Sequence, residues 1–99
     1  MPKFDVYRSP EGPGFLLDCQ TDLLSGLNTR LVVPLLPANA APHPATRLNP
    51  TFTVDGQAVV MVTQYAASVP LTLLRGAVAS LQADHIAITN AFDMLLSGY

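Results

Sequence analysis

The first thirty residues alternate between short apolar patches and breaks rich in proline and glycine. Phe4 and Val6 form the first patch, and residues 15–17 form the second. Between them, residues 8–14 hold two prolines and two glycines, a composition that interrupts any regular element. We therefore expect a strand, a loop over 8–14 and a second strand, followed over 22–29 by a connection with one short helical turn.

A longer apolar run over residues 30–36 predicts a strand whose two faces are both apolar. Pro34 lies inside this run, and because proline has no amide hydrogen to donate, it favours an edge position or a bulge. Residues 37–50 follow with four prolines and several alanines and asparagines. This composition predicts a surface loop that leads the chain back into the sheet.

The dipeptide Asp55-Gly56 is the strongest local structural signal in the chain. It suits the positive φ angles of a two-residue hairpin turn, so residues 51–54 and 57–63 are predicted to pair as antiparallel strands. Residues 58–62 show no alternation of polar and apolar side chains, which indicates that both faces of this strand are covered. Residues 69–74 predict a final short strand or extended segment.

The period changes near the C-terminus, where residues 83–96 predict an α-helix. Apolar residues at positions 87, 88, 91, 92, 94, 95 and 96 cover about half of its circumference, whereas packing on a sheet needs only about 100°. The surplus indicates a second contact surface, and Gly98 follows at the position of a helix C-cap. We expect one mainly β domain over residues 1–99, an antiparallel barrel or strongly bent sheet that carries a C-terminal α-helix.

The balance of residue types points to an interaction domain. Hydrophobic residues make up 49% of the chain and charged residues 12%, about half the ~25% that is typical of soluble domains. So few charges leave apolar surface for a second copy of the chain to cover, which predicts a homodimer. The net charge of -2 argues against non-specific binding to nucleic acid.

Other features predict a soluble protein of the cytoplasm. The apolar run over residues 31–38 is cut by prolines and is too short to span a membrane, so no membrane contact is expected. Residues 1–5 lack the apolar core of a signal peptide. Cys19 is the single cysteine of the sequence, which excludes an internal disulfide and suits a reducing compartment.

Few residues suggest catalysis or metal binding. His43 in the proline-rich loop and His85 near the helix start lack metal-ligand spacing, and we expect both at the solvated surface. Cys19, predicted to lie in a strand beside Asp18, is expected to be a packed, inert thiol, unless folding brings a histidine to activate it. No cofactor, metal site or catalytic residue is predicted.

Asp18 and Asp22 are close enough in sequence to be considered as a carboxylate pair for acid–base chemistry. Their positions favour a structural role, in which they end a strand and cap a turn. Arg30 precedes an apolar strand, and its expected role is a salt bridge to one of these acids. Composition and pattern therefore lead as far as a small dimerising interaction domain.

The order of several short motifs carries further information. They are residues 4–7 (FDVY), 18–24 (DCQTDLL), 27–35 (LNTRLVVPL), 47–50 (RLNP), 63–64 (TQ), 67–70 (ASVP) and 91–99 (AFDMLLSGY). In order and spacing they resemble the CcdB family of bacterial toxins, the gyrase poisons of type II toxin–antitoxin modules. The resemblance covers nearly the whole chain.

This resemblance implies an SH3-like barrel with a C-terminal helix that forms a two-fold homodimer. In such toxins the paired C-termini enter the cavity between the A subunits of DNA gyrase and hold the enzyme while its DNA is cut. The toxin is not an enzyme and makes no sequence-specific DNA contact alone. A CcdA-like antitoxin, whose disordered tail folds on binding, displaces the toxin from gyrase. Such modules act in plasmid maintenance or in a chromosomal stress response.

The resemblance also implies binding residues. The gyrase-binding positions are those that match the family's C-terminal tip and its supports: Leu23, Leu24, Asp93, Leu96, Ser97, Gly98 and Tyr99. The antitoxin-binding positions match one family loop: Arg8, Ser9, Pro10, Glu11, Gly12, Pro13 and Gly14. Met94 and Leu95 lie on the helix side expected near the two-fold axis, where core packing explains them equally well.

The C-terminus departs from the family pattern. The best-known member has a tryptophan at the position of Ser97 and an aliphatic residue at that of Tyr99, so we expect Tyr99 to replace part of the tryptophan's contact with a gyrase arginine. One alternative is a homologue that dimerises and binds antitoxin but no longer poisons gyrase. Another is a MazF-like ribonuclease on the same barrel, although five basic residues leave few groups to hold RNA phosphates.

Overall fold

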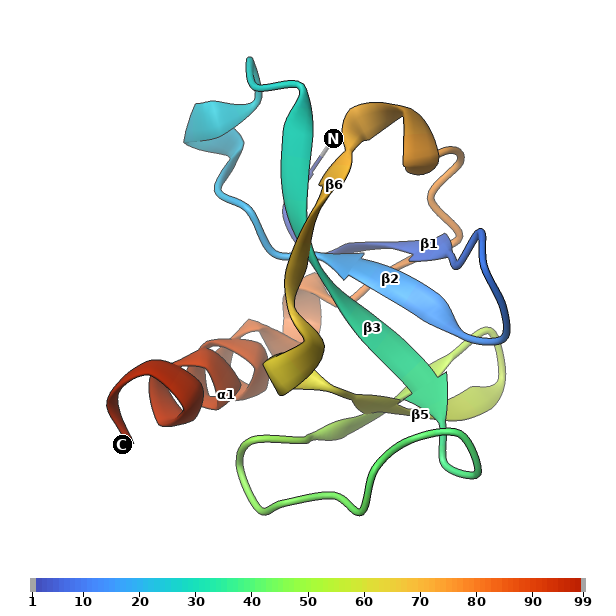
Figure 1. The fold of residues 1–99 in the computed structure, drawn as a ribbon, viewed down its shortest axis with the longest axis vertical. Helices are drawn as coiled ribbons and strands as arrows, with labels where there is room; N and C mark the ends of the chain where they lie inside the picture. The colour runs from blue at the N-terminus through green and yellow to red at the C-terminus, as the bar shows by residue number, and fades with distance from the viewer. Residues whose placement is uncertain (1, 99) are drawn as a thin grey trace.

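One antiparallel sheet organises the computed structural model, which describes residues 2–98 (Figure 1). Its strands are β1 (Asp5–Arg8), β2 (Phe15–Asp18), β3 (Thr29–Pro37), β4 (Thr51–Val54), β5 (Gln57–Met61), β6 (Ala67–Pro70) and β7 (Ala79–Ser80). The helix is α1 (His85–Ser97), and the short 3-10 turns are η1 (Asp22–Leu24), η2 (Thr63–Tyr65), η3 (Leu71–Leu73) and η4 (Gln82–Asp84). The strands run in the order β4-β5-β3-β2-β1-β7, and β6 lies beside β3.

β3 is the long central strand, and it pairs with two different strands along the same edge. Its C-terminal half pairs with β5, with Leu35 opposite Met61, and its N-terminal half pairs with β6, with Val32 opposite Ala67. β2 lies along its other edge. Because one strand belongs to both parts, the sheet bends into a nearly closed barrel. The predicted barrel or bent sheet with a C-terminal helix is confirmed.

Pro34 lies inside this sheet, so of the two predicted settings, an edge position or a bulge, the edge position was wrong. It is opposite Leu16 of β2, and its carbonyl accepts the Val62 N–H at 3.0 Å on the other side. β5 has ended at Met61 and β6 begins at Ala67, which leaves no ladder partner for the Pro34 nitrogen to serve. A break in the neighbouring strand thus accommodates the missing donor.

β3 carries apolar side chains on both faces, as its apolar run predicts, and both faces are covered. Val33 and Leu35 point into the main core, to which α1 contributes Ile88. Val32 points to the opposite face and packs in a second cluster with Tyr7 and Leu74. The main cluster consists of Phe4, Val6, Phe15, Leu17, Cys19, Val33, Leu35, Val54, Val59, Met61, Leu81, Ile88 and Ala91.

The hairpin and the helix were predicted correctly from local sequence signals. Asp55 and Gly56 have φ angles of 53° and 74° and join β4 to β5, although β5 ends at Met61, earlier than expected. Gly98 has a φ of 80° and donates its N–H to the Met94 carbonyl at 3.1 Å, which confirms the predicted C-cap. The expected final strand over 69–74 is only partly correct, because β6 ends at Pro70 and η3 follows.

Candidate partner-binding surface

The loop between β2 and β3, residues 19–28, turns apolar side chains toward solvent. Leu23 is 93% exposed, and Leu24 and Leu27 are each 48% exposed. Their turn, η1, begins where Thr21 Oγ1 accepts the Leu23 N–H at 3.3 Å. None of the three residues of η1 is buried, so the turn presents its leucines instead of packing them.

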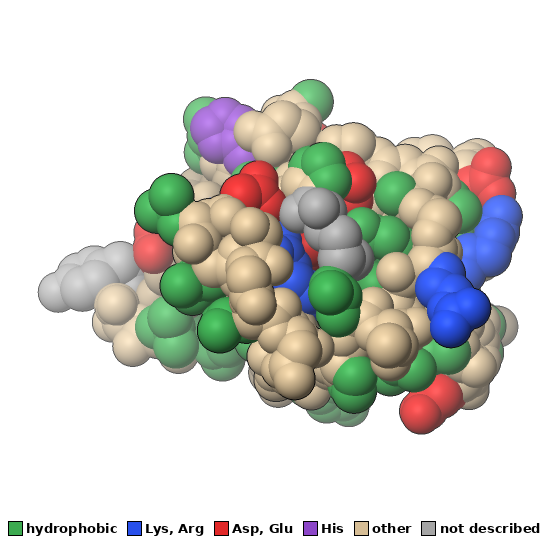
Figure 2. All heavy atoms as spheres, turned by 90° about the horizontal axis from the view of Figure 1, so that it is seen from above, with side chains coloured by type: hydrophobic (Ala, Val, Ile, Leu, Met, Phe, Trp, Pro, Cys, Tyr) green, Lys and Arg blue, Asp and Glu red, His purple; other side chains and the backbone are tan. Residues whose placement is uncertain are grey.

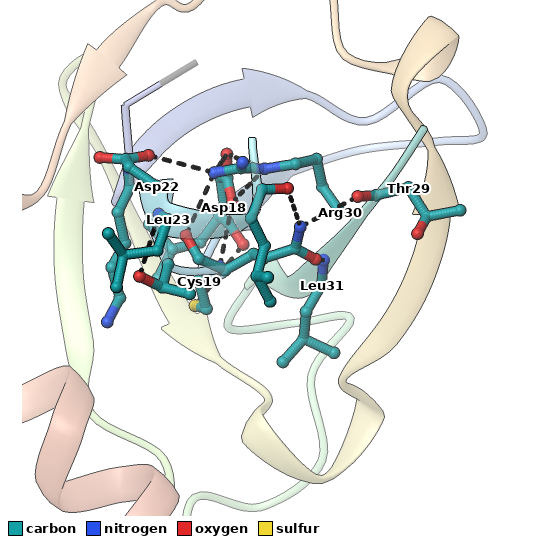
Figure 3. Close-up of polar contacts among 12 residues, drawn as sticks. Asp18, Cys19, Asp22, Leu23, Thr29, Arg30 and Leu31 are labelled. Atoms are coloured by element: carbon teal, nitrogen blue, oxygen red, sulfur yellow. Dashed lines mark hydrogen bonds and ion pairs between the residues drawn. The ribbon is translucent and has the colours of Figure 1, made fainter. Parts of the chain in front are cut away.

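A buried ion pair lies at the base of this loop (Figure 3). Arg30 Nη2 lies 2.8 Å from Asp18 Oδ2, and Arg30 Nε donates to both carboxylate oxygens at 3.1 and 2.9 Å. The two side chains are 1% and 0% exposed. Burial raises the pKa of the Asp18 carboxyl, whereas its bonds to Arg30 and to the Gln20 N–H lower it. The predicted salt bridge is confirmed.

Asp22 connects the loop to two other segments. Its carboxylate oxygens accept the Lys3 N–H at 3.0 and 3.2 Å, and its Oδ1 lies 3.4 Å from Arg30 Nη2 (Figure 3). The capping role expected of an acid here belongs to Thr21 instead. Asp22 therefore fixes η1 to the N-terminal segment and to β3.

Two further members of this network, Lys3 and Gln20, were not identified from the sequence. Lys3 acts through its backbone N–H, which no side-chain pattern reveals. Gln20 stands beside two acids and a cysteine in the sequence, where nothing distinguishes it from an ordinary loop residue. Its amide nevertheless bonds to both the loop and β3.

The last turns of α1 form the second apolar segment. Leu96 is 77% exposed, and Leu95 and Met94 are 40% and 37% exposed. η1 and the C-terminal end of α1 project on the same side of the sheet, at the left in Figure 1. In the view from above, hydrophobic side chains reach the surface on that side, while the most prominent basic ones lie on the right (Figure 2).

A pocket of about 190 Å³ lies between the N-terminal segment, β3 and α1. Its lining is mostly apolar: Lys3, Phe4, Cys19, Leu31, Ile88, Thr89, Phe92 and Leu96. Lys3, which lines it, also donates its backbone N–H to Asp22 of η1. The pocket therefore continues the surface from the β2–β3 loop to the exposed Leu96.

η1, β3 and the end of α1 all lie within one stretch of the chain that matches a known protein family. The profile of the family described as CcdB protein matches residues 3–98. The chain belongs to the CcdB family. Membership of this family implies that the chain is the toxin of a toxin–antitoxin module. Comparison with curated proteins gives no significant match.

Within this CcdB-family chain, most of the residues expected to bind gyrase gather on one side. Leu23 and Leu24 lie in η1, while Asp93, Leu96, Ser97 and Gly98 are exposed at the end of α1. Tyr99, also expected there, lies outside the described residues. Two segments far apart in sequence thus lie on the same side of the molecule, with η1 above and the end of α1 below in Figure 1.

The residues expected to bind antitoxin, Arg8–Gly14, lie elsewhere, at the turn from β1 to β2 on the right of Figure 1. Most are exposed. A groove of about 120 Å³ separates this turn from β6 and η3, lined by Ser9, Pro10, Glu11, Leu16, Val69 and Leu73. The structure therefore keeps the two sets of expected binding residues apart.

The residues that the sequence offered for catalysis or metal binding are either packed in the interior or exposed at the surface. Cys19 follows β2 instead of lying in it and is packed in the main core, where burial first and the Asp18 charge second raise the pKa of its thiol to about 12. His43 and His85 are exposed, as predicted. Within residues 2–98, no three His, Cys, Asp or Glu side chains are grouped to hold a metal ion. The same residues include no helix long and apolar enough to cross a membrane.

Proposed function

We propose that this chain is a gyrase poison, which acts in the cytoplasm as a homodimer of single-domain protomers. In this proposal the paired tips bind the A subunit of DNA gyrase and trap the enzyme on cleaved DNA. The contacting residues are Leu23, Leu24, Asp93, Leu96, Ser97, Gly98 and Tyr99. A CcdA-like antitoxin releases gyrase by occupying the toxin.

The observation that carries this proposal is the pair of exposed apolar segments on one side of the molecule. Leu23 at 93% exposure and Leu96 at 77% leave apolar surface in water that a partner can cover. Burial of a leucine side chain contributes about 1.5–3 kcal/mol, so these two side chains supply favourable anchors. Family membership supports gyrase as the partner.

The shape of the end of α1 supports its proposed insertion into the partner. Gly98 takes a left-handed conformation and ends the helix, and a Cβ built on it meets no atom within 4 Å. The tip is therefore narrow, with Asp93 and Ser97 exposed beside it to form polar contacts. We propose that Tyr99 adds an aromatic face for a gyrase guanidinium.

We further propose that the chain acts by binding and catalyses no reaction. The raised pKa of Cys19, about 12, keeps its thiol protonated near neutral pH, where a nucleophile needs the thiolate. Asp18 is tied to Arg30 inside the protein. Both residues therefore serve packing and structure, which supports a binding function.

The antitoxin contact is proposed for Arg8–Gly14 and the adjoining groove. The groove offers apolar walls from Leu16 and Leu73 and polar groups from Ser9 and Glu11. An extended tail that folds on binding uses such a combination, with apolar anchors for affinity and polar contacts for register.

Two experiments test this function. The chain is expressed in bacteria without antitoxin, and the purified protein is added to a gyrase cleavage assay. We expect growth arrest, rescue by a mutation in the gyrase A subunit, and accumulation of cleaved DNA. Leu96→Ala should weaken poisoning at least about tenfold, because it removes an apolar anchor. Ile86→Ala is the matched control, since Ile86 is 65% exposed on the same helix but about 15 Å away along its axis.

Deletion of Ser97–Tyr99 should abolish cleavage-complex formation, and Tyr99→Ala should weaken it. Full poisoning by the deletion variant would contradict the proposed tip. If the native chain binds antitoxin yet leaves gyrase active, the chain is the non-poisoning homologue. Equal poisoning by Tyr99→Ala would remove Tyr99 from the contact.

A further inference from the structure

The β2–β3 loop raises a physical question, because it holds an apolar side chain almost entirely in water. Leu23 is 93% exposed, and no residue of η1 is buried. Hydrophobic packing therefore does not fix the turn. The segment spans residues 19–28 between two strands, and a loop of this length loses considerable conformational entropy when it is ordered.

The side chain of Gln20 supplies bonds that close this loop. Its Nε2 donates to the carbonyls of Leu24 at 3.3 Å and Thr29 at 3.1 Å, while its Oε1 accepts the Leu31 N–H at 3.0 Å. The first acceptor lies at the end of η1 and the other two groups lie in β3. One amide thus joins the exposed turn to the central strand.

Gln20 is itself held by the buried ion pair. Its backbone N–H donates to Asp18 Oδ1 at 3.1 Å, and its carbonyl accepts from Arg30 Nη2 at 3.1 Å. The side chains of Asp18 and Arg30 are almost completely buried. The buried ion pair therefore holds the backbone of Gln20, and the side chain of Gln20 in turn holds the turn that carries Leu23.

We propose that Gln20 is a positioning residue, which holds the β2–β3 loop in the shape that presents Leu23 to gyrase. This inference rests on the proposed function. A loop that is ordered before binding loses less entropy in the complex, so the clamp raises affinity without touching the partner. Gln20 appears in neither set of expected binding residues.

A double-mutant cycle tests this role with the purified chain and the purified gyrase A subunit. Gln20→Leu removes all three side-chain bonds at similar size, and Gln20→Glu keeps the acceptor for the Leu31 N–H but loses the donors to the two carbonyls. We expect each variant to bind about tenfold more weakly. In a Leu23→Ala background, the same changes should weaken binding less than about twofold, because the presented side chain is gone.

Gln57→Leu is the matched control, since Gln57 is an exposed glutamine beside the β4–β5 turn, and it should leave binding unchanged. Thermal melting of each variant checks folding. Equal losses in the native and Leu23→Ala backgrounds, or no loss in either, would overturn the proposal.

Hydrogen exchange separates failure of this inference from failure of the proposed function. In Gln20→Leu, the amides of Leu24 and Leu27 should exchange about tenfold faster, with the β3 amides unchanged. Unchanged exchange in the loop would overturn the clamp, whatever gyrase does. If the native chain does not bind gyrase, both the proposed function and the presenting role fall, while faster exchange still establishes Gln20 as the residue that orders the loop.

Discussion

The two loops that flank β2 are held in opposite ways. The β2–β3 loop begins at the Asp18–Arg30 pair, whose side chains are 0% and 1% exposed. The β1–β2 turn is tied to the rest of the sheet by Arg8 and Asp55, which lie 3.1 Å apart with side chains 65% and 59% exposed. A buried pair is costly to break because a charge stays uncompensated, whereas an exposed pair contributes little.

This difference matches the two partners that we propose. A loop ordered from within suits a preformed cavity, since the probe must already have its bound shape. An exposed turn beside a groove, with only a surface ion pair at its outer side, suits a tail that folds as it binds. The four predictions below test this comparison.

Replacing Arg30 should have the largest effect. Arg30→Met leaves the Asp18 carboxylate buried without its partner, and we expect a loss of about 3–5 kcal/mol in the free energy of unfolding, measured with urea. The double variant Asp18→Leu with Arg30→Met removes both charges and should recover at least half of that loss. A loss below about 1 kcal/mol for Arg30→Met would show that the β2–β3 loop does not depend on the pair.

Gly14→Ala should be the next most damaging change and tests where the β1–β2 turn is fixed. Gly14 has a φ of 95°, and an added Cβ would collide with the carbonyl oxygen of Leu35 in β3. We expect a loss of about 1–3 kcal/mol. Gly26→Ala in the other loop is the control: its Cβ meets nothing within 4 Å, and its effect should stay within about 0.5 kcal/mol. Equal stability of the two variants contradicts the close approach of Gly14 to β3.

The stability of the protein at alkaline pH tests how deeply Cys19 is buried where the β2–β3 loop begins. In the folded chain the pKa of the thiol is raised to about 12, whereas in the unfolded chain it is near 8.5, so above that pH only the unfolded chain releases the proton. Stability contributed by the neutral thiol is therefore lost as pH rises, by about 1.4 kcal/mol at about pH 9.5. Urea denaturation of the native chain and Cys19→Ala at neutral and alkaline pH measures this difference. Identical pH dependence of the two would show that the thiol titrates normally.

The smallest effect is expected at the surface pair. Asp55→Ala removes the partner of Arg8, and we expect a loss of only about 0.2–1 kcal/mol that shrinks at high salt. A cycle with Arg8→Ala isolates the pair from other effects of each change. A coupling above about 2 kcal/mol would mean that the β1–β2 turn is held as firmly as its neighbour.

Much of the fold follows from local chemistry that the sequence displays. Asp55-Gly56 specifies its hairpin by backbone preference alone, and the apolar period after residue 83 specifies the helix. β7 was not predicted, because Ala79 and Ser80 form a strand only through their pairing with β1. The setting of Pro34 was mispredicted for the same reason, because the gap between β5 and β6 that accommodates it lies in a distant part of the sequence.

The candidate site divides in the same way. The apolar surplus on α1 was visible in the sequence, and Leu96 is indeed exposed. A salt bridge of Arg30 was expected, but its burial was not: the pair is almost completely buried, and local sequence does not show which distant segments cover it. The role of Gln20 could not be predicted from the sequence, because its side chain reaches its hydrogen-bond partners only once the β2–β3 loop has folded.

The pairing of β1 with β7 has a consequence for biosynthesis. Because synthesis runs from the N-terminus, β1 leaves the ribosome well before its partner β7 and before the helix that shares a core with Phe4 and Val6. A nascent chain therefore cannot close this core until β7 and α1 have been made. Products that stop before β7 lack both the closed core and the exposed apolar end of α1 that we propose as the partner-binding tip.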